Sequence, residues 1–411
     1  MKNLRAACAA TAILLVLSHA RRSEAVDVYM DWAGSAATMA AAWSAAGYGA
    51  GAELTAPEIT GIIGSVMAKV DAKYTGYTVD FTDTVPTGDY EWMKLGSTTA
   101  STTTYGASSG VDWRNRVKDG GAEIYLANFG PILSAAGFTR AENLARFSAA
   151  IANTTAHELG HTLGLQHYDA YGIPGITAPG YMFSGEQNES IMATGVTGLT
   201  APDRGHDRFF NPFELLKLEF ADGATATLGT TVAEAPGPKD TLATAQSIFG
   251  TDLPLSGLSA VNVDGATSIP GQVDIYKFYM FGGSTITANT MSHGHYVPST
   301  NTTITLMDGT GTPMFSSTDI HFDGDDFMDP LATYYSDDSL ILNFMVPSTG
   351  FYYMKVTGTG PGDYDLLMAG LATVPEPGPI AAVGLGLVWL VRWRRGAQKN
   401  NAPSSHETAS R

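Results

Sequence analysis

Apolar positions in the first half of the chain follow two spacings, one helical and one strand-like. Residues 57–74 begin with proline, which suits the first turn of a helix, and continue with apolar residues at helical spacing. These residues are Ile59, Ile62, Ile63, Val66, Met67 and Val70. Residues 140–165 repeat that spacing, so we predict two long helices. Residues 26–32, 77–81 and 122–128 have strand-like patterns instead.

A Thr-, Ala- and Gly-rich stretch separates this half of the chain from a second half of different character. Residues 221–240 contain Pro236-Gly237-Pro238 and are predicted to be a linker. Short runs of β-branched and aromatic residues then recur between turn formers, which is typical of a β-sandwich. The runs are 274–281, 284–290, 302–307, 340–346, 351–356 and 364–368. We therefore expect an α+β domain over 26–220, with a twisted sheet and two long helices, followed by an all-β sandwich over 241–372.

Length and charge narrow the class of protein. The chain has 411 residues, which suits two domains. Its formal net charge is −17, and residues 26–374 hold 14 basic against 37 acidic side chains. Such a surface repels phosphate backbones, so nucleic-acid binding is not expected. Cys8 is the only cysteine and lies in a segment that we expect to be removed, so disulfides and cysteine-ligated zinc are not expected in the mature protein.

Both ends of the chain have the pattern of export signals. Residues 1–25 combine Lys2 and Arg5 with a short apolar run and small residues, which predicts a secretory signal peptide. An uncleaved membrane anchor is the alternative. Near the other end, residues 380–391 are apolar and are followed by an arginine cluster, which favours a cytoplasmic side for those arginines. Either interpretation places the body of the protein outside the cytoplasm.

Candidate chemistry is concentrated in His157-Glu158-Leu159-Gly160-His161, which is followed by Gly164 and His167. On a helix, His157 and His161 project from one face and can share a metal ion. A continuous helix would carry His167 roughly 120° away from that face, so the helix has to end before it. Gly164 can adopt the left-handed conformation that ends helices. The chain can then turn back and bring the third imidazole to the other two.

Three neutral imidazoles with an open fourth position describe a catalytic Zn²⁺ site, because structural zinc sites are closed by four protein ligands. Zinc lowers the pKa of a bound water towards about 7. Glu158 lies next to His157 and off the ligand face, so it can take the proton from that water and pass it to a leaving amine. Metal-free histidines on a buried helix and a zinc site without activity are the alternatives.

The complete pattern His-Glu-x-x-His-x-x-Gly-x-x-His resembles that of the metzincin metallopeptidases. This family also has a Met-turn, which Ser190-Ile191-Met192-Ala193-Thr194-Gly195 resembles, with Met192 placed 25 residues after His167. The resemblance covers about residues 26–220 and implies a zinc endopeptidase that acts on proteins or peptides. It also implies that Met192 packs under the imidazoles as an apolar floor and is not a ligand.

Two positions depart from the best-known subfamilies of metzincins. Tyr168 follows the third histidine, and Thr194 stands where some members carry a tyrosine ligand, so no such ligand is expected. In the family the substrate lies extended beside an edge strand, for which residues 122–128 are the candidate. An ordinary strand inside the sheet is the alternative. Residues 168–191 would supply the specificity pocket.

Two further resemblances concern the second half. Val374-Pro375-Glu376-Pro377, the apolar run and the arginines resemble the PEP-CTERM sorting signal of Gram-negative bacteria. This implies an exosortase-type partner and delivery to the cell surface, the outer envelope or an extracellular matrix; a plain membrane anchor is the alternative. Asp274-Ile275-Tyr276-Lys277-Phe278 and the strand pattern around it resemble the pre-peptidase C-terminal domain, which implies an accessory role.

Weaker candidates for metal binding lie in the second half. An acidic loop offers oxygen ligands to Ca²⁺, although its spacing is not that of an EF-hand and a metal-free loop is the alternative. This loop holds Asp323, Gly324, Asp325 and Asp326. His293 and His295 are explained more simply by an exposed turn than by a second metal. Two functions therefore stay open: an exported zinc endopeptidase, and a non-catalytic surface or matrix binding protein with a relic zinc site.

Overall fold

The structure is a computed structural model that describes residues 26–167, 189–193, 199–221, 229–292, 300–318, 320–323, 333–336 and 338–373. The chain divides into two compact units, Met1–Ala372 and Thr373–Arg411. Several expected features lie outside the described residues. They are the signal peptide, the pocket segment 168–188, Thr194 and Gly195, His293 and His295, residues 324–326 of the acidic loop, and the sorting tail from 374 onward.

A five-stranded sheet in the order β2-β1-β3-β5-β4 organises the N-terminal half. The strands are β1 (Val26–Asp31), β2 (Val79–Thr82), β3 (Glu91–Leu95), β4 (Gly106–Ser108) and β5 (Gly121–Ile124). The first four neighbours in this order run parallel, and β4 pairs antiparallel with β5 at the edge. Side chains of β1 alternate between buried and half-buried, as a strand in a covered sheet requires.

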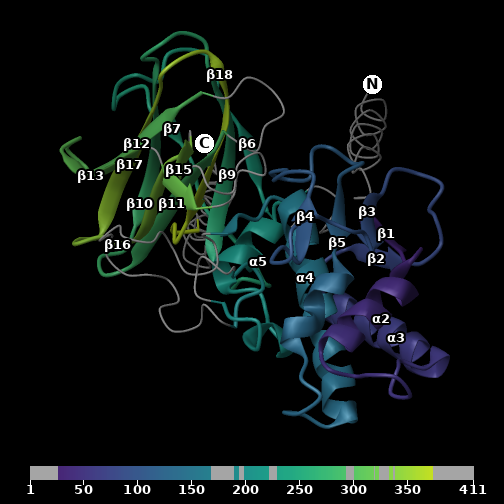
Figure 1. The fold of residues 1–411 in the computed structure, drawn as a ribbon. Helices are drawn as coiled ribbons and strands as arrows, with labels where there is room; N and C mark the ends of the chain where they lie inside the picture. Colours follow the sequence, from purple (N-terminus) through teal and green to yellow (C-terminus); the bar gives the residue numbers. More distant parts are fainter. Residues whose placement is uncertain are drawn as a thin grey trace, which may run out of the picture. The chain divides into compact units, whose positions relative to one another are not determined.

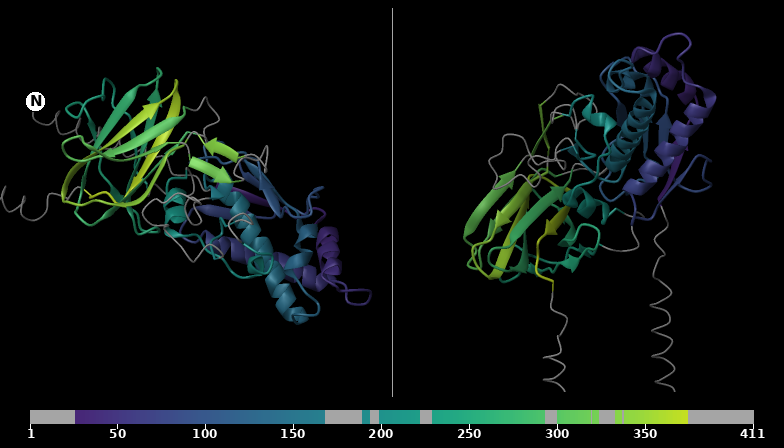
Figure 2. Two further views of the ribbon diagram at one scale, coloured as in Figure 1. Left: turned by 60° about the vertical axis from the view of Figure 1, so that its left-hand side comes forward. Right: turned by 90° about the horizontal axis from the view of Figure 1, so that it is seen from below.

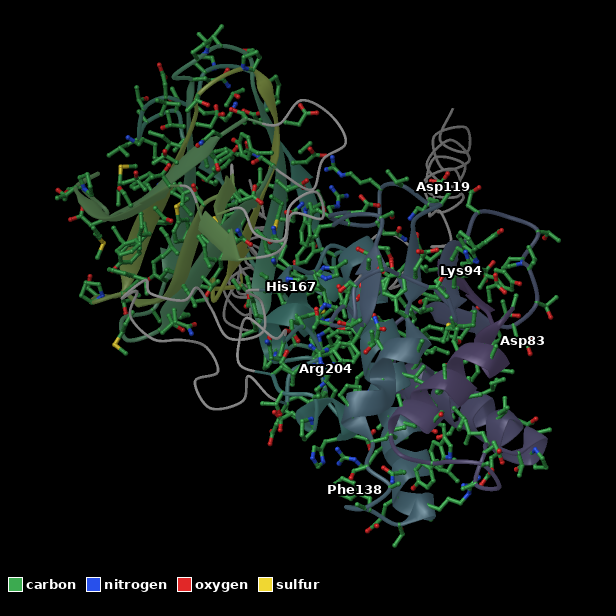
Figure 3. The ribbon with its side chains drawn as sticks, in the orientation of Figure 1. Asp83, Lys94, Asp119, Phe138, His167 and Arg204 are labelled. Carbon is green, nitrogen blue, oxygen red and sulfur yellow. The ribbon has the colours of Figure 1, made fainter. Side chains whose placement is uncertain are left out.

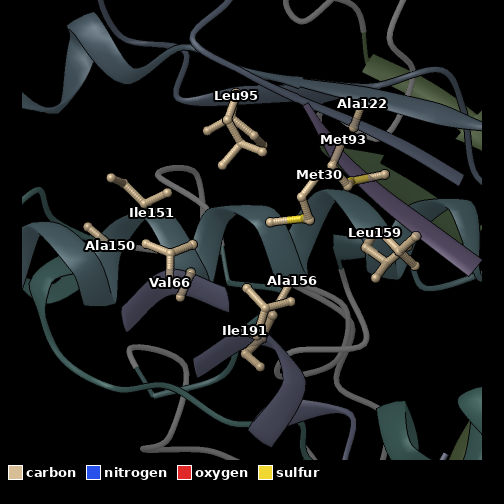
Figure 4. Packing of buried hydrophobic residues seen from close by; sticks show 14 of the residues in the cluster. Met30, Val66, Met93, Leu95, Ala122, Ala150, Ile151, Ala156, Leu159 and Ile191 are labelled. Atoms are coloured by element: carbon tan, nitrogen blue, oxygen red, sulfur yellow. The ribbon is translucent and has the colours of Figure 1, made fainter. Parts of the chain in front are cut away.

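Helices pack on this sheet and close the core (Figure 1). They are α2 (Ser35–Ala45), α3 (Ala56–Lys73) and α4 (Arg140–Thr162), followed by the short α5 (Pro212–Leu218). Figure 4 shows Met30, Met93 and Leu95 of the sheet above the apolar face of α4, with Val66 of α3 and Ile191 on its other side. The helix α4 is therefore buried along most of its length, and this packing fixes the direction of the side chains on its last turn.

The substrate edge expected over residues 122–128 is wrong. In the structure β5 ends at Ile124, and residues Leu126–Ile132 form the 3₁₀ helix η1. The strand β5 is not an edge strand, because β4 pairs with it from Gly106 opposite Ile124 to Ser108 opposite Ala122. Alternation of apolar and polar residues reports burial on two faces of a strand and carries no information about sheet order. Among the described strands, the edges of this sheet are β2 and β4, and β4 is the edge beside β5.

The second half is a sandwich of two sheets, ordered β13-β12-β17-β10-β7 and β16-β11-β18-β9-β6 (Figures 1 and 2). Their strands are β6 (Thr231–Ala233), β7 (Gln246–Ser247), β9 (Ser259–Thr267), β10 (Val273–Met280), β11 (Thr285–Met291), β12 (Thr302–Met307), β13 (Pro313–Thr318), β16 (Leu340–Met345), β17 (Gly350–Gly358) and β18 (Gly362–Ala369). The short β8 (Thr251–Asp252) pairs with β9, and β14 (Ile320–Asp323) pairs with β15 (Thr333–Ser336). Side chains from both sheets meet in one apolar core.

Part of the expected linker belongs to this sandwich. Residues Thr231–Ala233 form β6, which pairs parallel with β9 from Thr231 opposite Asn262. Lys239 also makes an isolated bridge to Asp274 of β10. The short segment Thr231–Ala233 lies among small and polar residues, which gives only a weak strand signal. The composition of this stretch therefore did not predict that it pairs with β9.

The two halves share an apolar cluster and a buried ion pair within the first compact unit. Trp113 and Phe213 pack with Leu367 and other sandwich residues. Asp365 of β18 is fully buried and accepts hydrogen bonds from Arg116 Nη2 (2.6 Å) and Arg114 Nη1 (3.4 Å). Among the described residues, no helix is both long enough and apolar enough to cross a membrane.

Candidate metal centre

The helix α4 carries the first two histidines of the motif on a rigid base. It begins with a capping box, in which Thr139 Oγ1 accepts from the Glu142 amide (3.2 Å) and Glu142 Oε2 accepts from the Thr139 amide (2.7 Å). From Ser148 to Thr162 every residue is buried. A long buried helix has little freedom to turn about its axis, so His157 and His161 keep a fixed orientation on one face of α4.

The helix ends where the histidine spacing required it to end. Gly164 adopts a φ of +99°, and the Leu165 amide donates to the Gly160 carbonyl at 2.8 Å. This left-handed residue reverses the chain after α4. The Cβ of any other residue at Gly164 would lie 2.9 Å from the Trp113 Cα, so the reversal is also packed tightly from outside. The reversal returns His167 to the face that carries His157 and His161.

The three Nε2 atoms of His157, His161 and His167 converge on one point. They are 3.0 Å apart for His157 and His167, 3.1 Å for His161 and His167, and 3.2 Å for His157 and His161. Metal–nitrogen bonds of about 2.0–2.1 Å in tetrahedral geometry place ligand nitrogens about 3.3–3.4 Å apart. The three Nε2 separations are slightly shorter than this range, so the triangle is close to the size of a zinc site.

The hydrogen bonds on the far side of two rings fit the same conclusion. His157 Nδ1 lies 2.8 Å from the Ile191 carbonyl oxygen, and His161 Nδ1 lies 2.7 Å from that of Leu165. A carbonyl only accepts, so each Nδ1 carries the proton and each Nε2 presents a lone pair. Burial, followed by the proximity of His161 and His167, lowers the pKa of His157 well below its usual value. Lone pairs that face each other at this distance could be shared by one metal ion.

Glu158 lies beside the triad, between α4 and the edge strand β4. A Cβ added to Gly106 would come within 2.5 Å of Glu158 Oε1, so the carboxylate lies directly against the β4 backbone. Burial raises the pKa of Glu158 to about 8, while the nearby His167, Arg204 and the Ser108 backbone oppose that rise. The carboxylate is thus enclosed on the side away from the triad and is close to both the triad and the open edge.

Met192 packs beneath the ligand helix. The Met192 side chain is fully buried, and its Sδ would lie 2.9 Å from a Cβ placed on Gly160, the residue before His161. Ser190 Oγ accepts from the Met192 amide (3.3 Å) and donates to Glu214 Oε1 (2.7 Å), which holds the turn against α5. Met192 therefore lies against α4 at Gly160, whose missing side chain allows the close approach, and its role as an apolar floor under the imidazoles stays a prediction.

Sequence reasoning missed two contributors to the site. The Ile191 carbonyl, which orients His157, has no side-chain signature in the sequence. Arg204 belongs to the short helix η3 (Asp203–Gly205), stacks on Tyr105 at 4.4 Å, and interacts electrostatically with Glu158. Figure 3 labels Arg204 together with His167. An arginine after an unpatterned loop gives no sequence signal, so only the folded chain reveals this cation near the carboxylate.

Comparisons with known proteins add little at this point. No protein-family model matches the chain. No curated protein matches it either. Among solved structures, the chain is similar to the pre-peptidase C-terminal domain of a collagenase from Bacillus anthracis. The identity is 16%, the match covers 34% of this chain and 93% of that one, and the TM-score is 0.17. The function is therefore inferred from the residues of the site.

Proposed function

We propose that the chain is a zinc-dependent endopeptidase of the metzincin type, in which His157, His161 and His167 hold the metal and Glu158 is the catalytic acid and base. The observation that carries this proposal is the convergence of three Nε2 atoms within 3.2 Å, with a buried carboxylate beside them. A zinc ion there would activate a water molecule and polarise the scissile carbonyl.

Each residue has a task in this proposal that follows from its place. Glu158 accepts a proton from the attacking water at its carboxylate and then delivers it to the leaving nitrogen. In the described part of the sheet β4 has no strand on its outer side, where the Gly106 backbone groups and the Ser108 carbonyl can pair with an extended peptide beside Glu158. The Ser108 amide already donates to Glu158. The carbonyls of Ile191 and Leu165 keep the imidazoles of His157 and His161 in the orientation that presents Nε2.

Export of the protein is part of the same proposal. The signal peptide over 1–25 and the PEP-CTERM pattern after 373 support delivery to the surface, outer envelope or matrix of a Gram-negative bacterium. The sandwich over 241–372 would then be an accessory domain of the exported peptidase. A Ca²⁺ site in the acidic loop stays a prediction from sequence, since residues 324–326 lie outside the described residues.

The test is Glu158→Gln in the full chain, with casein as substrate and zinc content measured on the same sample. We expect kcat/KM to fall on the order of 10²–10⁴-fold, with the zinc content unchanged because the ligands are intact. Glu53→Gln, on an exposed loop, is the matched control and should behave as wild type. A chelator should abolish hydrolysis by the wild type, and added zinc should restore it.

Two outcomes would reject the proposal. Hydrolysis that survives in Glu158→Gln at the wild-type rate would remove the carboxylate from the mechanism. The wild type and the variant could also bind equal amounts of zinc while neither hydrolyses peptides. That result would favour the alternative function, a surface or matrix binding protein with a relic zinc site.

A further inference from the structure

One end of the sandwich exposes large apolar side chains, and we call it the apolar tip. It consists of Phe249, Phe281, Met345 and Phe351, whose exposed fractions are 47%, 59%, 63% and 49%. Among the described residues these are four of the nine large hydrophobic side chains that are exposed. Isolated exposed apolar residues are ordinary, but a contiguous group of them marks a binding surface.

Strand register places these four residues at the same end. The last residue of β10, Met280, pairs with Gly350 at the start of β17, so Phe281 and Phe351 are neighbours. Met345 at the end of β16 pairs with Thr285 at the start of β11. Phe249 follows β7, which runs parallel to β10 and therefore ends on the same side.

The aromatic members touch one another through Tyr279. Its ring meets those of Phe281 and Phe351 edge-on, with centroids 5.7 Å and 5.2 Å apart. Lys277 Nζ of β10 lies 4.2 Å from the centroid of the Phe351 ring of β17, on the same face of the sheet. Tyr279, Phe281 and Phe351 thus form one aromatic cluster with a lysine at its border, and Phe249 and Met345 lie at the same end of the sandwich.

Four segments of the tip carry no charge. Residues 248–251, 281–285, 345–351 and 369–373 contain no aspartate, glutamate, lysine or arginine. The whole chain, by contrast, has a formal net charge of −17. One acidic residue, Asp308, lies at this end in the turn between β12 and β13, where Gly309 packs against the Phe351 backbone. The tip is therefore poor in charge for such an acidic protein, which suits an apolar partner.

The chain also leaves the sandwich at this end. The Ala372 amide donates to the Tyr279 carbonyl at 3.1 Å, and the last described residue, Thr373, follows directly. The sequence after it holds the apolar run 380–391 and then Arg392, Arg394 and Arg395. An apolar segment followed by arginines is typical of a membrane-directed end, and it begins seven residues after Thr373.

We propose that the apolar tip rests on the surface of a lipid bilayer, with its phenylalanine rings in the interfacial region. Half-exposed aromatic rings favour this region, and Lys277 can face anionic headgroups at its border. The tip and the membrane-directed sequence would then act on one membrane, and two signals hold a protein there more firmly than one. This inference does not depend on the proposed peptidase activity.

The first test measures binding to vesicles of phosphatidylethanolamine and phosphatidylglycerol by flotation. The full chain carrying Phe281→Ser and Phe351→Ser should bind about tenfold more weakly than the wild type, because two half-exposed rings no longer leave water. The matched control carries Ile269→Ser and Val85→Ser, which are equally exposed but lie outside the tip. It should bind as the wild type does, and all variants should melt at the same temperature.

The second test shows which end faces the lipid. Cys8 is the only cysteine, so a Cys8→Ser background allows one environment-sensitive dye at Ser348→Cys in the tip or at Ser268→Cys before β10. Vesicles should shift the emission of the tip label to the blue and leave the other unchanged. Equal shifts at both positions, or no shift at the tip, would overturn the proposal. The proposal would also be overturned if replacing the tip phenylalanines dissociated a dimer of the protein and left vesicle binding unchanged.

Discussion

Gly164 illustrates how one residue determines the geometry of the metal centre. Its φ of +99° lies in the left-handed region, and an added Cβ would meet Trp113 Cα and Cε3 at 2.9 Å. We expect Gly164→Ala to lower the free energy of unfolding by about 2–4 kcal/mol and to weaken zinc binding, since His167 depends on this reversal. Chemical denaturation and titration against a competing chelator measure both effects.

The control for this prediction is a glycine without either constraint. Gly61 lies within α3 and has nothing within 4 Å of an added Cβ, so Gly61→Ala should gain about 0.5–1 kcal/mol. Equal stability of the two variants would mean that the chain reversal does not rely on glycine.

Glu91 makes stability depend on pH. It is buried at the start of β3, and burial raises its pKa to about 8 from the usual 4.5, with a smaller contribution from Asp112. The folded chain therefore keeps a proton that the unfolded chain loses, so stability falls as the pH rises from about 4.5 to 8. We expect Glu91→Gln to reduce this fall by several kcal/mol at most, since one pKa unit corresponds to about 1.4 kcal/mol.

Thermal unfolding of the wild type and of Glu91→Gln at several pH values checks the prediction. The difference between the two should grow in favour of the variant up to about pH 8 and then level off. Parallel pH profiles would show that Glu91 titrates as an exposed carboxylate does.

At the scale of elements, β4 and α4 approach each other closely at Gly106. A Cβ added there would lie 2.5 Å from Glu158 Oε1, 2.8 Å from its Cγ and 2.9 Å from its Cδ, so the whole Glu158 side chain would have to move. We expect Gly106→Ala to displace this carboxylate, and so to lower kcat/KM by at least tenfold with unchanged zinc content. Gly88→Ala, where an added Cβ meets nothing, is the control. Full activity in Gly106→Ala would separate β4 from the catalytic carboxylate.

The sequence predicted the elements whose pattern is local. The helix expected over 57–74 is α3, and the one expected over 140–165 is α4, which ends three residues earlier. Six sandwich strands, β10, β11, β12, β16, β17 and β18, were expected within a few residues of their bounds, whereas β9 and β13 were missed. The convergence of three histidines followed from helical spacing. The short strand β4 escaped prediction, because Gly-Ala-Ser has no apolar alternation and becomes a strand only by pairing with β5.

At the scale of the whole molecule, the buried carboxylate of Asp365 connects the two halves. We expect Asp365→Ala to destabilise the protein by about 3–5 kcal/mol, because Arg114 and Arg116 lose their buried partner. Asp264 faces the same two arginines at 3.8 Å with 48% of its side chain exposed, so Asp264→Ala should cost less than about 1 kcal/mol. Calorimetry of both variants measures their melting temperatures, and equal values would contradict the prediction.

The residues that join the halves also touch the end of the ligand helix. The Asp112 amide donates to the His161 carbonyl at 2.9 Å, Trp113 packs on Gly164, and Arg114 and Arg116 reach the sandwich. Transplanting either half into a chimaera without residues 112–116 would leave the recipient with an unsupported turn or an orphaned carboxylate. Exchange of the sandwich for another would therefore have to change this loop at the same time.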